Sequence, residues 1–295
     1  MDTQVGRPVV VGVDSSDRAM DAVRWGANEA ARRRVPLRVV SAFSSTEDHV
    51  VGQPGLDERH GDILLEQVRK ALAEAVRVAT EQHPELEVCQ QLTLGLPINV
   101  LAAEARRAQL VVVGDRGLSR VGRLLVGSVA VALASQAACP IVVVRGRQPP
   151  ATSSLPVVVG VDGSPVSEAA IAFGYQAAAD RGVPLTAVHT WWDTDPGPAT
   201  QLFREADQVY EQELLAERLA GWRDKYPDVE VERIVARDRP THRLLEQSAN
   251  AQLVVVGSRG HGEFAGLILG SVSNALVHEA GCPVAIVRPD PAAWP

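Results

Sequence analysis

The sequence predicts an α/β protein made of two tandem domains, each built around an open, doubly wound parallel sheet. Three observations lead to this prediction. The chain has 295 residues, which exceeds one typical domain. Its motifs recur in the second half, and short β-branched runs alternate with amphipathic helical patterns. We expect domains at residues 1–147 and 154–295, with a linker at 148–153 inside a Pro- and Ser-rich stretch.

Five runs in the first half are typical of strands. They lie near Val9–Val13, Leu37–Ala42, Leu86–Leu94, Leu110–Val113 and Ile141–Val144. The first, fourth and fifth runs are continuously apolar, as expected for strands covered on both faces of a parallel sheet. Gln90 and Gln91 interrupt the third run, which therefore predicts an edge strand.

Amphipathic helices are expected between these strands. Ser15 or Ser16 can cap the first helix, and its inward stripe comprises Ala19, Ala22, Val23, Ala27 and Ala30. In the second half Ser164 can act as the cap, with Pro165 at the first helical position. The second helix is predicted over Asp57–Gln82, with a stripe of Leu64, Leu65, Val68, Leu72, Ala75 and Ala79.

The second half repeats the first, including a glycine-spaced loop. Val9–Asp14 returns as Val157–Asp162 at an offset of 148 (162−14), and later matches have an offset of 143 (257−114). Gly114-Asp115-Arg116-Gly117, nine residues and Gly127-Ser128 recur as Gly257-Ser258-Arg259-Gly260, nine residues and Gly270-Ser271. Each copy stands between an apolar strand and an apolar helix, which favours two nucleotide-binding folds.

The loop has the residue types that a phosphate site requires. Glycines such as Gly114 and Gly117 let the backbone turn sharply and expose its N–H groups. Gly127-Ser128 opens a helix whose unpaired N–H groups favour an anion, and Arg116 or Arg259 can add a charge-assisted contact. The alternative is a glycine turn that only packs a helix against the sheet. No lysine precedes Ser128 or Ser271, so this is not a P-loop, and the spacing is not GxGxxG.

Acidic residues at the end of the first strand of each half form a second paired signal. Asp14 and Asp162 can bind a ribose hydroxyl or a Mg²⁺ ion carried by phosphates. The alternative is a helix cap or first-turn acid. We expect Gly12 and Gly160 to let a nucleotide approach this strand end closely.

The G-x2-G-x9-G-[ST] spacing, the first-strand Val-Asp and the βα order resemble the ATP-binding branch of the universal stress protein family. Its tandem form is familiar from actinobacteria. The resemblance implies a Rossmann-like, adenine nucleotide α-hydrolase-like fold with a five-stranded parallel sheet per domain. It implies that ATP, with Mg²⁺, is bound by Asp14, Gly114, Gly117, Gly127, Ser128 and their equivalents Asp162, Gly257, Gly260, Gly270 and Ser271. The adenine position of the family maps to Ala42 and Thr190, and further candidates by position are Asp115, Arg120, Val129, Ser258, His261, Val272 and Ser273.

The resemblance also implies a function and an assembly. Family members act mostly as stress, dormancy or growth regulators, sometimes with slow ATP hydrolysis. In such families the strand near Ile141–Val144 often pairs domains, so we expect the two halves to form an internal pseudo-dimer, and a homodimer of the whole chain is plausible.

Two alternatives stay open. One is an enzyme of the adenine-nucleotide α-hydrolase type, although Asp14-Ser-Ser-Asp17 does not supply the Ser-Gly-Gly-x-Asp loop of that group. The other is an assembly module with vestigial loops. We assign no catalytic residue, because Asp115 is a candidate by position alone. The seven histidines lack the spacings of a protein-built metal site.

The two copies differ in charge. Arg120 and Arg123 in the first loop correspond to Glu263 and Gly266 in the second. We therefore predict weaker ATP binding in the second half at low salt, because nearby cations favour phosphate. Ala130 stands where the second copy has Ser273, so the first copy can lack one hydroxyl to phosphate.

Net charge, cysteine content and hydrophobic stretches indicate which classes of partner and which cellular compartment to expect. The net charge of −7 argues against a general nucleic-acid or anionic-membrane surface. Three widely spaced cysteines without a CxxC pair fit a reducing compartment. The first residues lack the features of a signal peptide, and no apolar stretch is long enough to span a bilayer. We expect a cytoplasmic protein.

Overall fold

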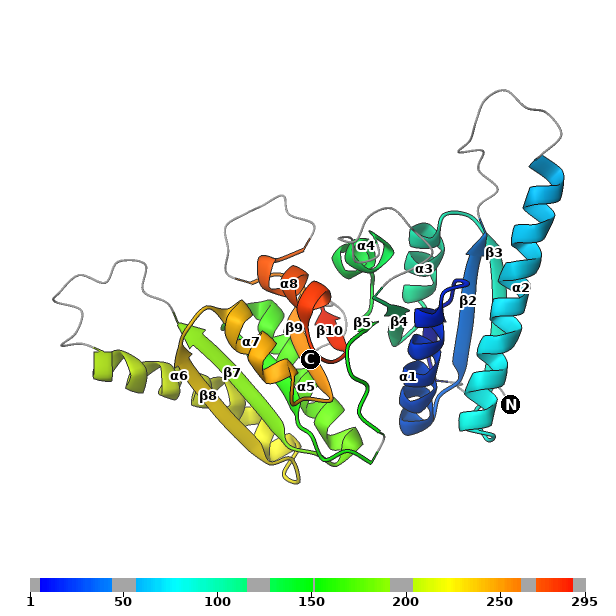
Figure 1. The fold of residues 1–295 in the computed structure, drawn as a ribbon. Helices are drawn as coiled ribbons and strands as arrows, with labels where there is room; N and C mark the ends of the chain where they lie inside the picture. Colours follow the sequence, from blue (N-terminus) through cyan, green and yellow to red (C-terminus); the bar gives the residue numbers. More distant parts are fainter. Residues whose placement is uncertain are drawn as a thin grey trace. The chain divides into compact units, whose positions relative to one another are not determined.

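The chain folds into two compact units, Met1–Val144 and Arg145–Pro295 (Figure 1). The structure is a computed structural model that describes residues 6–43, 57–115, 128–150, 152–191, 204–260 and 269–288. Each unit is an alternation of strands and helices, so the α/β class predicted from the sequence is confirmed.

The first unit contains one parallel sheet in the order β3-β2-β1-β4-β5. Its elements are β1 (Val9–Gly12), α1 (Asp17–Arg33), β2 (Leu37–Phe43), α2 (Asp57–Gln82), β3 (Val88–Leu94), α3 (Pro97–Ala105), β4 (Leu110–Gly114), α4 (Ser128–Gln136) and β5 (Ile141–Val144). Helix α1 contacts α2 and helix α3 contacts α4, as expected for a doubly wound sheet. The strand with Gln90 and Gln91, β3, ends the strand order of its unit, as predicted.

The second unit repeats this arrangement in the order β8-β7-β6-β9-β10, again with parallel neighbours. Its elements are β6 (Val157–Val161), α5 (Pro165–Arg181), β7 (Leu185–Trp191), α6 (Arg204–Lys225), β8 (Val231–Arg237), α7 (Pro240–Ser248), β9 (Leu253–Gly257), α8 (Ser271–Glu279) and β10 (Val284–Val287). Chain order therefore departs from the central strand β6 in two directions, toward β7 and toward β9. Ligands of open α/β sheets bind at such a switch point.

The continuously apolar strands form the core of each unit. Every residue of β5 and β10 is buried, as are Val9, Val10 and Val11 of β1. The inward stripe predicted for α1 is also buried, with Ala22, Val23, Ala27 and Ala30 fully so. Burial of these side chains on both faces of the sheet supplies the main favourable free energy of folding.

Two details of the helices differ from the sequence predictions. Ser16 is the residue before α1, but its hydroxyl makes no capping bond and instead donates to Asp14 Oδ1. Ser164 does cap α5, because its Oγ accepts from the Ser167 N–H at 3.2 Å. In α2 the apolar stripe is buried at Leu72 but 40% exposed at Leu64, because the first turns of α2 extend beyond the sheet (Figure 1).

Among the helices of the described residues, none combines the length and the hydrophobicity that a membrane span requires.

Candidate functional site

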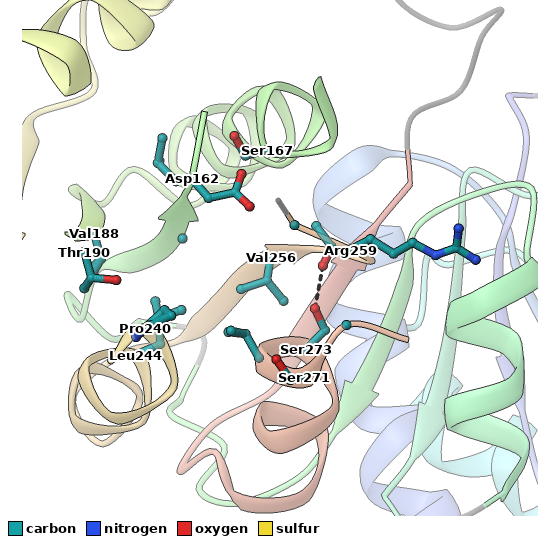
Figure 2. A pocket seen from close by; sticks show the side chains of 16 residues that line it. Asp162, Ser167, Val188, Thr190, Pro240, Leu244, Val256, Arg259, Ser271 and Ser273 are labelled. Atoms are coloured by element: carbon teal, nitrogen blue, oxygen red, sulfur yellow. Dashed lines mark hydrogen bonds between the residues drawn. The ribbon is translucent and has the colours of Figure 1, made fainter. Parts of the chain in front are cut away.

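A cavity of about 480 Å³ opens at the carboxyl ends of β6 and β9 in the second unit (Figure 2). It lies at the switch point of the sheet, between the strands from which the chain order diverges. Five elements besides the strands themselves contribute to it: the turn after β6, the first turn of α5, α7, the turn after β9 and the start of α8.

Most residues predicted for the second half lie at this cavity. Those in its wall are Gly160, Asp162, Thr190, Gly257, Arg259, Gly260, Gly270, Ser271, Val272 and Ser273. Ser258 lies behind the wall, where its N–H donates to the Val287 carbonyl at 2.7 Å and its carbonyl accepts from the Gly270 N–H at 2.9 Å. These two bonds hold the turn after β9 against β10 and the start of α8. His261 falls outside the described residues.

The first unit places the equivalent strand ends in the same way. Gly12 is the last residue of β1 and Asp14 lies just after it, Ala42 is the last but one residue of β2, Gly114 ends β4 and Asp115 follows it, and Val129 lies in the first turn of α4. The remaining predicted residues, Arg116, Gly117, Arg120 and Gly127, lie outside the described residues, as does the side chain of Ser128. The geometry of the site is therefore taken from the second unit.

The glycines of β1 and β6 have a packing role. A Cβ on Gly12 would lie 2.8 Å from Leu101 Cδ1, and a Cβ on Gly160 would lie 3.1 Å from Leu244 Cδ1. A leucine of the third helix of each unit therefore packs directly on the glycine. Gly160 also lines the cavity, so the close approach of a nucleotide to these strand ends stays a prediction.

Asp162 has a structural role at the turn and also lines the cavity. Its Oδ1 accepts from the N–H of Ser164 at 2.9 Å and from the hydroxyl of Ser164 at 2.6 Å. Asp14 makes the same pair of bonds with Ser16, at 3.0 and 2.5 Å. The aspartates thus shape the turn that leads into the first helix, and Asp162 presents a carboxylate at the cavity wall (Figure 2).

The start of α8 forms one end of the cavity. Gly270 is the residue before the helix and has φ −62° and ψ 151°, and as a glycine it has no side chain with which to cap the helix. The first N–H groups of a helix have no intrahelical acceptor, and the helix dipole adds positive potential there. Ser271, Val272 and Ser273 present these groups along the cavity wall.

Ser273 is a buried hydroxyl that supports the turn. Its Oγ donates to the carbonyl of Gly257 at 2.6 Å, the dashed line in Figure 2. The hydroxyl proton of Ser273 therefore points to the end of β9. Toward a ligand, the Ser273 oxygen can act only as a hydrogen-bond acceptor. Ala130 occupies the same position in the first unit (273−130 = 143).

Arg259 belongs to the wall of the cavity, and Arg288 lies near it in the second unit. The side chain of Arg259 extends away from the cavity in Figure 2, and its charge-assisted contact with a phosphate stays a prediction. Burial, and then the charge of Arg259, lower the pKa of Arg288, which places the two cations close enough to repel each other. An anion near Arg259 would relieve this repulsion.

The apolar wall was not identified from the sequence. It consists of Val161, Val188, Pro240, Leu244 and Val256, with Ser167 at the start of α5. Pro240 and Leu244 correspond to Pro97 and Leu101 in the first unit (240−97 = 143). That repeated Pro-x3-Leu spacing is the signal that could have found them.

His189 is a residue that the sequence marks only as an ordinary strand-end or surface histidine. It is buried at the end of β7, where Nδ1 lies 2.8 Å from the Val161 carbonyl oxygen and Nε2 lies 2.8 Å from Glu211 Oε2. It therefore ties the end of β6, next to Asp162, to helix α6. Ser41 occupies this position in the first unit (189−148 = 41), so the tie is specific to the second unit.

Asp115 lies just after β4, close to the first turn of α1. Asp115 is 3% exposed, and its Oδ1 lies 3.8 Å from Nε of Arg18 at the start of α1. The two charged groups form a long ion pair, and a role of Asp115 in binding stays a prediction. Within the described ranges no three His, Cys, Asp or Glu side chains are grouped in a way that could hold a metal ion.

Comparisons with known proteins agree with this architecture. A model described as the universal stress protein family matches residues 6–145 and 155–288. A universal stress protein of Mycobacterium tuberculosis is 41% identical over 285 residues, covering 95% of this chain and 96% of that protein. One from Mycolicibacterium smegmatis is 40% identical over 291 residues, covering 95% and 97%. The crystal structure of a universal stress protein from Archaeoglobus fulgidus has a TM-score of 0.68 at 19% identity and covers 97% of this chain and 99% of that chain, which is a likeness of fold.

Proposed function

The chain belongs to the universal stress protein family, and on this premise we propose that it is a regulatory protein that binds an adenine nucleotide, ATP, in each half. The observation that carries the proposal is the pairing of an apolar wall with an uncapped helix start in one cavity at the switch point of the sheet. A base needs the first and a phosphate group needs the second.

The residues present fit such a ligand. The volume of about 480 Å³ falls in the usual range for small-molecule and cofactor sites. Val188, Leu244 and Val256 offer apolar surface for a base, and Thr190 adds a hydroxyl beside it. The N–H groups at the start of α8 suit phosphate oxygens.

Asp162 supports the placement of the sugar and the metal. Its Oδ1 is held by Ser164, which fixes the carboxylate in position at the cavity wall. A carboxylate so placed suits a ribose hydroxyl, or one ligand position of Mg²⁺ whose other ligands come from the phosphates and water. Asp14 has the same local geometry in the first half.

A binding role is favoured over an enzymatic one. Hydrolysis needs a group that activates water, and Asp115, the carboxylate next to Gly114, is buried beside Arg18. The second unit has Ser258 at this position, and its backbone is committed to the turn. We infer that nucleotide occupancy changes the loop after β4 and β9, and thereby the surface that a partner meets in a stress response. The pseudo-dimer of the two halves and a homodimer of the chain remain proposals from the resemblance.

The experiment is to denature the purified full chain and identify any released nucleotide by mass spectrometry, and then to incubate the native protein with ATP and Mg²⁺. The proposal expects ATP or another adenine nucleotide in near-stoichiometric amount and negligible turnover. Steady release of AMP and pyrophosphate would support the α-hydrolase alternative instead. A protein that neither carries nor takes up nucleotide would support the vestigial-loop alternative.

A further inference from the structure

A second cavity, of about 590 Å³, lies in the second unit beside α6 and the segment that leads into β8. We call it the arginine-tyrosine hollow, defined by Tyr175, Leu219, Arg223, Val229, Val231 and Arg233. Val231 is the first residue of β8, so the hollow lies at the amino ends of the strands. The nucleotide cavity lies at their carboxyl ends, and the two cavities share no lining residue.

The floor of the hollow is apolar and well ordered by packing. Leu219 and Val229 are 5% and 7% exposed, and Tyr175 is 1% exposed. The ring of Tyr175 stacks on Trp222 and Tyr226, with ring centroids 6.0 and 5.7 Å away. This stack fixes the phenol at the edge of the cavity.

The polar groups of the hollow are donors and cations without a partner in the described structure. No described residue hydrogen-bonds the hydroxyl of Tyr175, although its side chain is almost completely buried. Within the same residues neither Arg223 nor Arg233 has a carboxylate within ion-pair distance, and Glu230 is the one acid in the wall. Burial raises the pKa of Tyr175 while the charges of Arg223 and Arg233 oppose the increase, so the phenol is a neutral donor close to two cations.

We propose that the arginine-tyrosine hollow binds a small organic carboxylate with an aliphatic or aromatic body. The body would cover Leu219, Val229 and the Tyr175 ring. The carboxylate would accept from Arg223, Arg233 and the Tyr175 hydroxyl, since planar guanidinium groups match carboxylate geometry. Inorganic phosphate would leave the apolar floor exposed to water, and a cation would meet two like charges.

The polar groups of this site are a property of the second unit alone. Tyr175 corresponds to Ala27 (175−148 = 27), and Arg223 and Arg233 correspond to Thr80 and Gln90 (223−143 = 80, 233−143 = 90). The apolar positions are kept, because Val229 and Val231 correspond to Leu86 and Val88 (offset 143). The second unit therefore keeps the apolar positions of the first unit and adds three hydrogen-bond donors, Tyr175, Arg223 and Arg233.

The test is binding of decanoate, below its micellar concentration, to the full chain, measured by isothermal calorimetry. The proposal expects one saturable site, and decanol, which has the same tail without the charge, is expected to bind at least about 10-fold more weakly. Replacing both arginines (Arg223→Gln with Arg233→Gln) is expected to weaken decanoate binding by about 10-fold or more, and Tyr175→Phe by a smaller factor. Both arginines are exposed, so these variants keep the fold.

Arg237→Gln, on the same strand but outside the hollow, is the matched control and is expected to bind decanoate as the native chain does. A saturating non-hydrolysable ATP analogue is expected to leave decanoate binding unchanged. Equal affinity for decanol and decanoate, equal affinity of the double variant, or displacement by the ATP analogue would each overturn the proposal. None of these outcomes depends on whether the other cavity binds ATP.

Discussion

Gly260 lies directly over the carboxylate of Asp162, so that a Cβ on Gly260 would collide with Asp162 Oδ2. The turn after β9 and the turn after β6 therefore meet at one wall of the cavity. A glycine here avoids a clash with the Asp162 side chain, which is a physical reason for a residue that the sequence pattern had marked only by its spacing.

Replacing this glycine is expected to disturb one site and leave the other. In Gly260→Ala the new methyl group displaces Asp162 or lifts the turn, and we expect ATP affinity in the second half to fall by at least about 10-fold. Calorimetry at low salt should then record a single remaining site in the first half, the tighter of the two by the charge argument. Two unchanged sites would contradict the assignment.

Gly221→Ala is the matched control for this variant. Gly221 lies inside α6, and a Cβ there meets no atom within 4 Å. The substitution should leave nucleotide binding unchanged and stabilise the chain by about 0.5–1 kcal/mol, because alanine loses less backbone entropy on helix formation.

The hydroxyl of Ser273 is predicted to stabilise the loop. Ser273→Ala leaves the Gly257 carbonyl without its 2.6 Å bond, and we expect a loss of about 1–2 kcal/mol in the free energy of unfolding, measured with urea. Asn274→Ala, at the next and exposed position of α8, should cost nothing comparable. An equal loss in both variants would indicate a general effect on the helix.

The end of α1 stores backbone strain that the second unit avoids. Arg34 has φ 55° at the end of α1, and Gly182 has φ 62° at the equivalent end of α5 (182−148 = 34). Because non-glycine residues are disfavoured in this region, Arg34→Gly is expected to stabilise the first unit by about 0.5–1 kcal/mol. Gly182→Ala is expected to destabilise the second by a similar amount, and thermal unfolding of the two variants compares them. A lower melting temperature for Arg34→Gly would contradict this reading.

The three cysteines are predicted to differ in reactivity. Cys89 is exposed on β3, whereas Cys139 and Cys282 are buried, and burial raises the pKa of both to about 12. A thiol reagent at pH 8 should modify one thiol of the native chain rapidly, and Cys89→Ser should abolish that phase. Rapid modification of Cys139 and Cys282 would contradict the prediction, because it would show that the segments before β5 and β10 open readily to solvent.

The burial of Cys139 and Cys282 makes the free energy of unfolding depend on pH in the alkaline range. A thiol whose pKa is raised by folding keeps its proton in the native state while the unfolded chain loses it. The contribution is therefore fully present below the ordinary value of 9.0 and is lost as the pH rises toward 12. Urea unfolding at pH 7 and pH 10 should record a smaller decrease for the Cys139→Ala, Cys282→Ala double variant than for the native chain.

Sequence patterns were sufficient for the architecture because parallel sheets are built from continuously apolar runs with helices between them. The repeat then located the loops after β4 and β9. The repeat does not reveal the role of every residue that it contains, as the equivalent residues Gln109 and Gln252 show. In the structure Gln109 Nε2 donates to the Arg7 carbonyl, and Gln252 Nε2 donates to the carbonyls of Ser153 and Leu155, so both hold the segment entering a central strand.

The parts of the site that escaped prediction depend on contacts between distant segments. Leu244 packs on Gly160 across 84 positions of sequence (244−160), and the repeated Pro-x3-Leu spacing marks the leucine without saying which residue it contacts. His189 likewise is ordinary in sequence, and its two bonds to Val161 and Glu211 exist only because β6, β7 and α6 come together. The exposure of Leu64 in α2 was not predicted, because the periodicity of a helix does not tell where the sheet beside it ends.

The central claim is that each half is an adenine nucleotide site, and native mass spectrometry of the full chain titrated with ATP and Mg²⁺ tests it most directly. The account predicts a chain that takes up two nucleotides, with Gly260→Ala taking up one over the same range and Gly221→Ala taking up two. A native chain that stays free of nucleotide at millimolar ATP would contradict it.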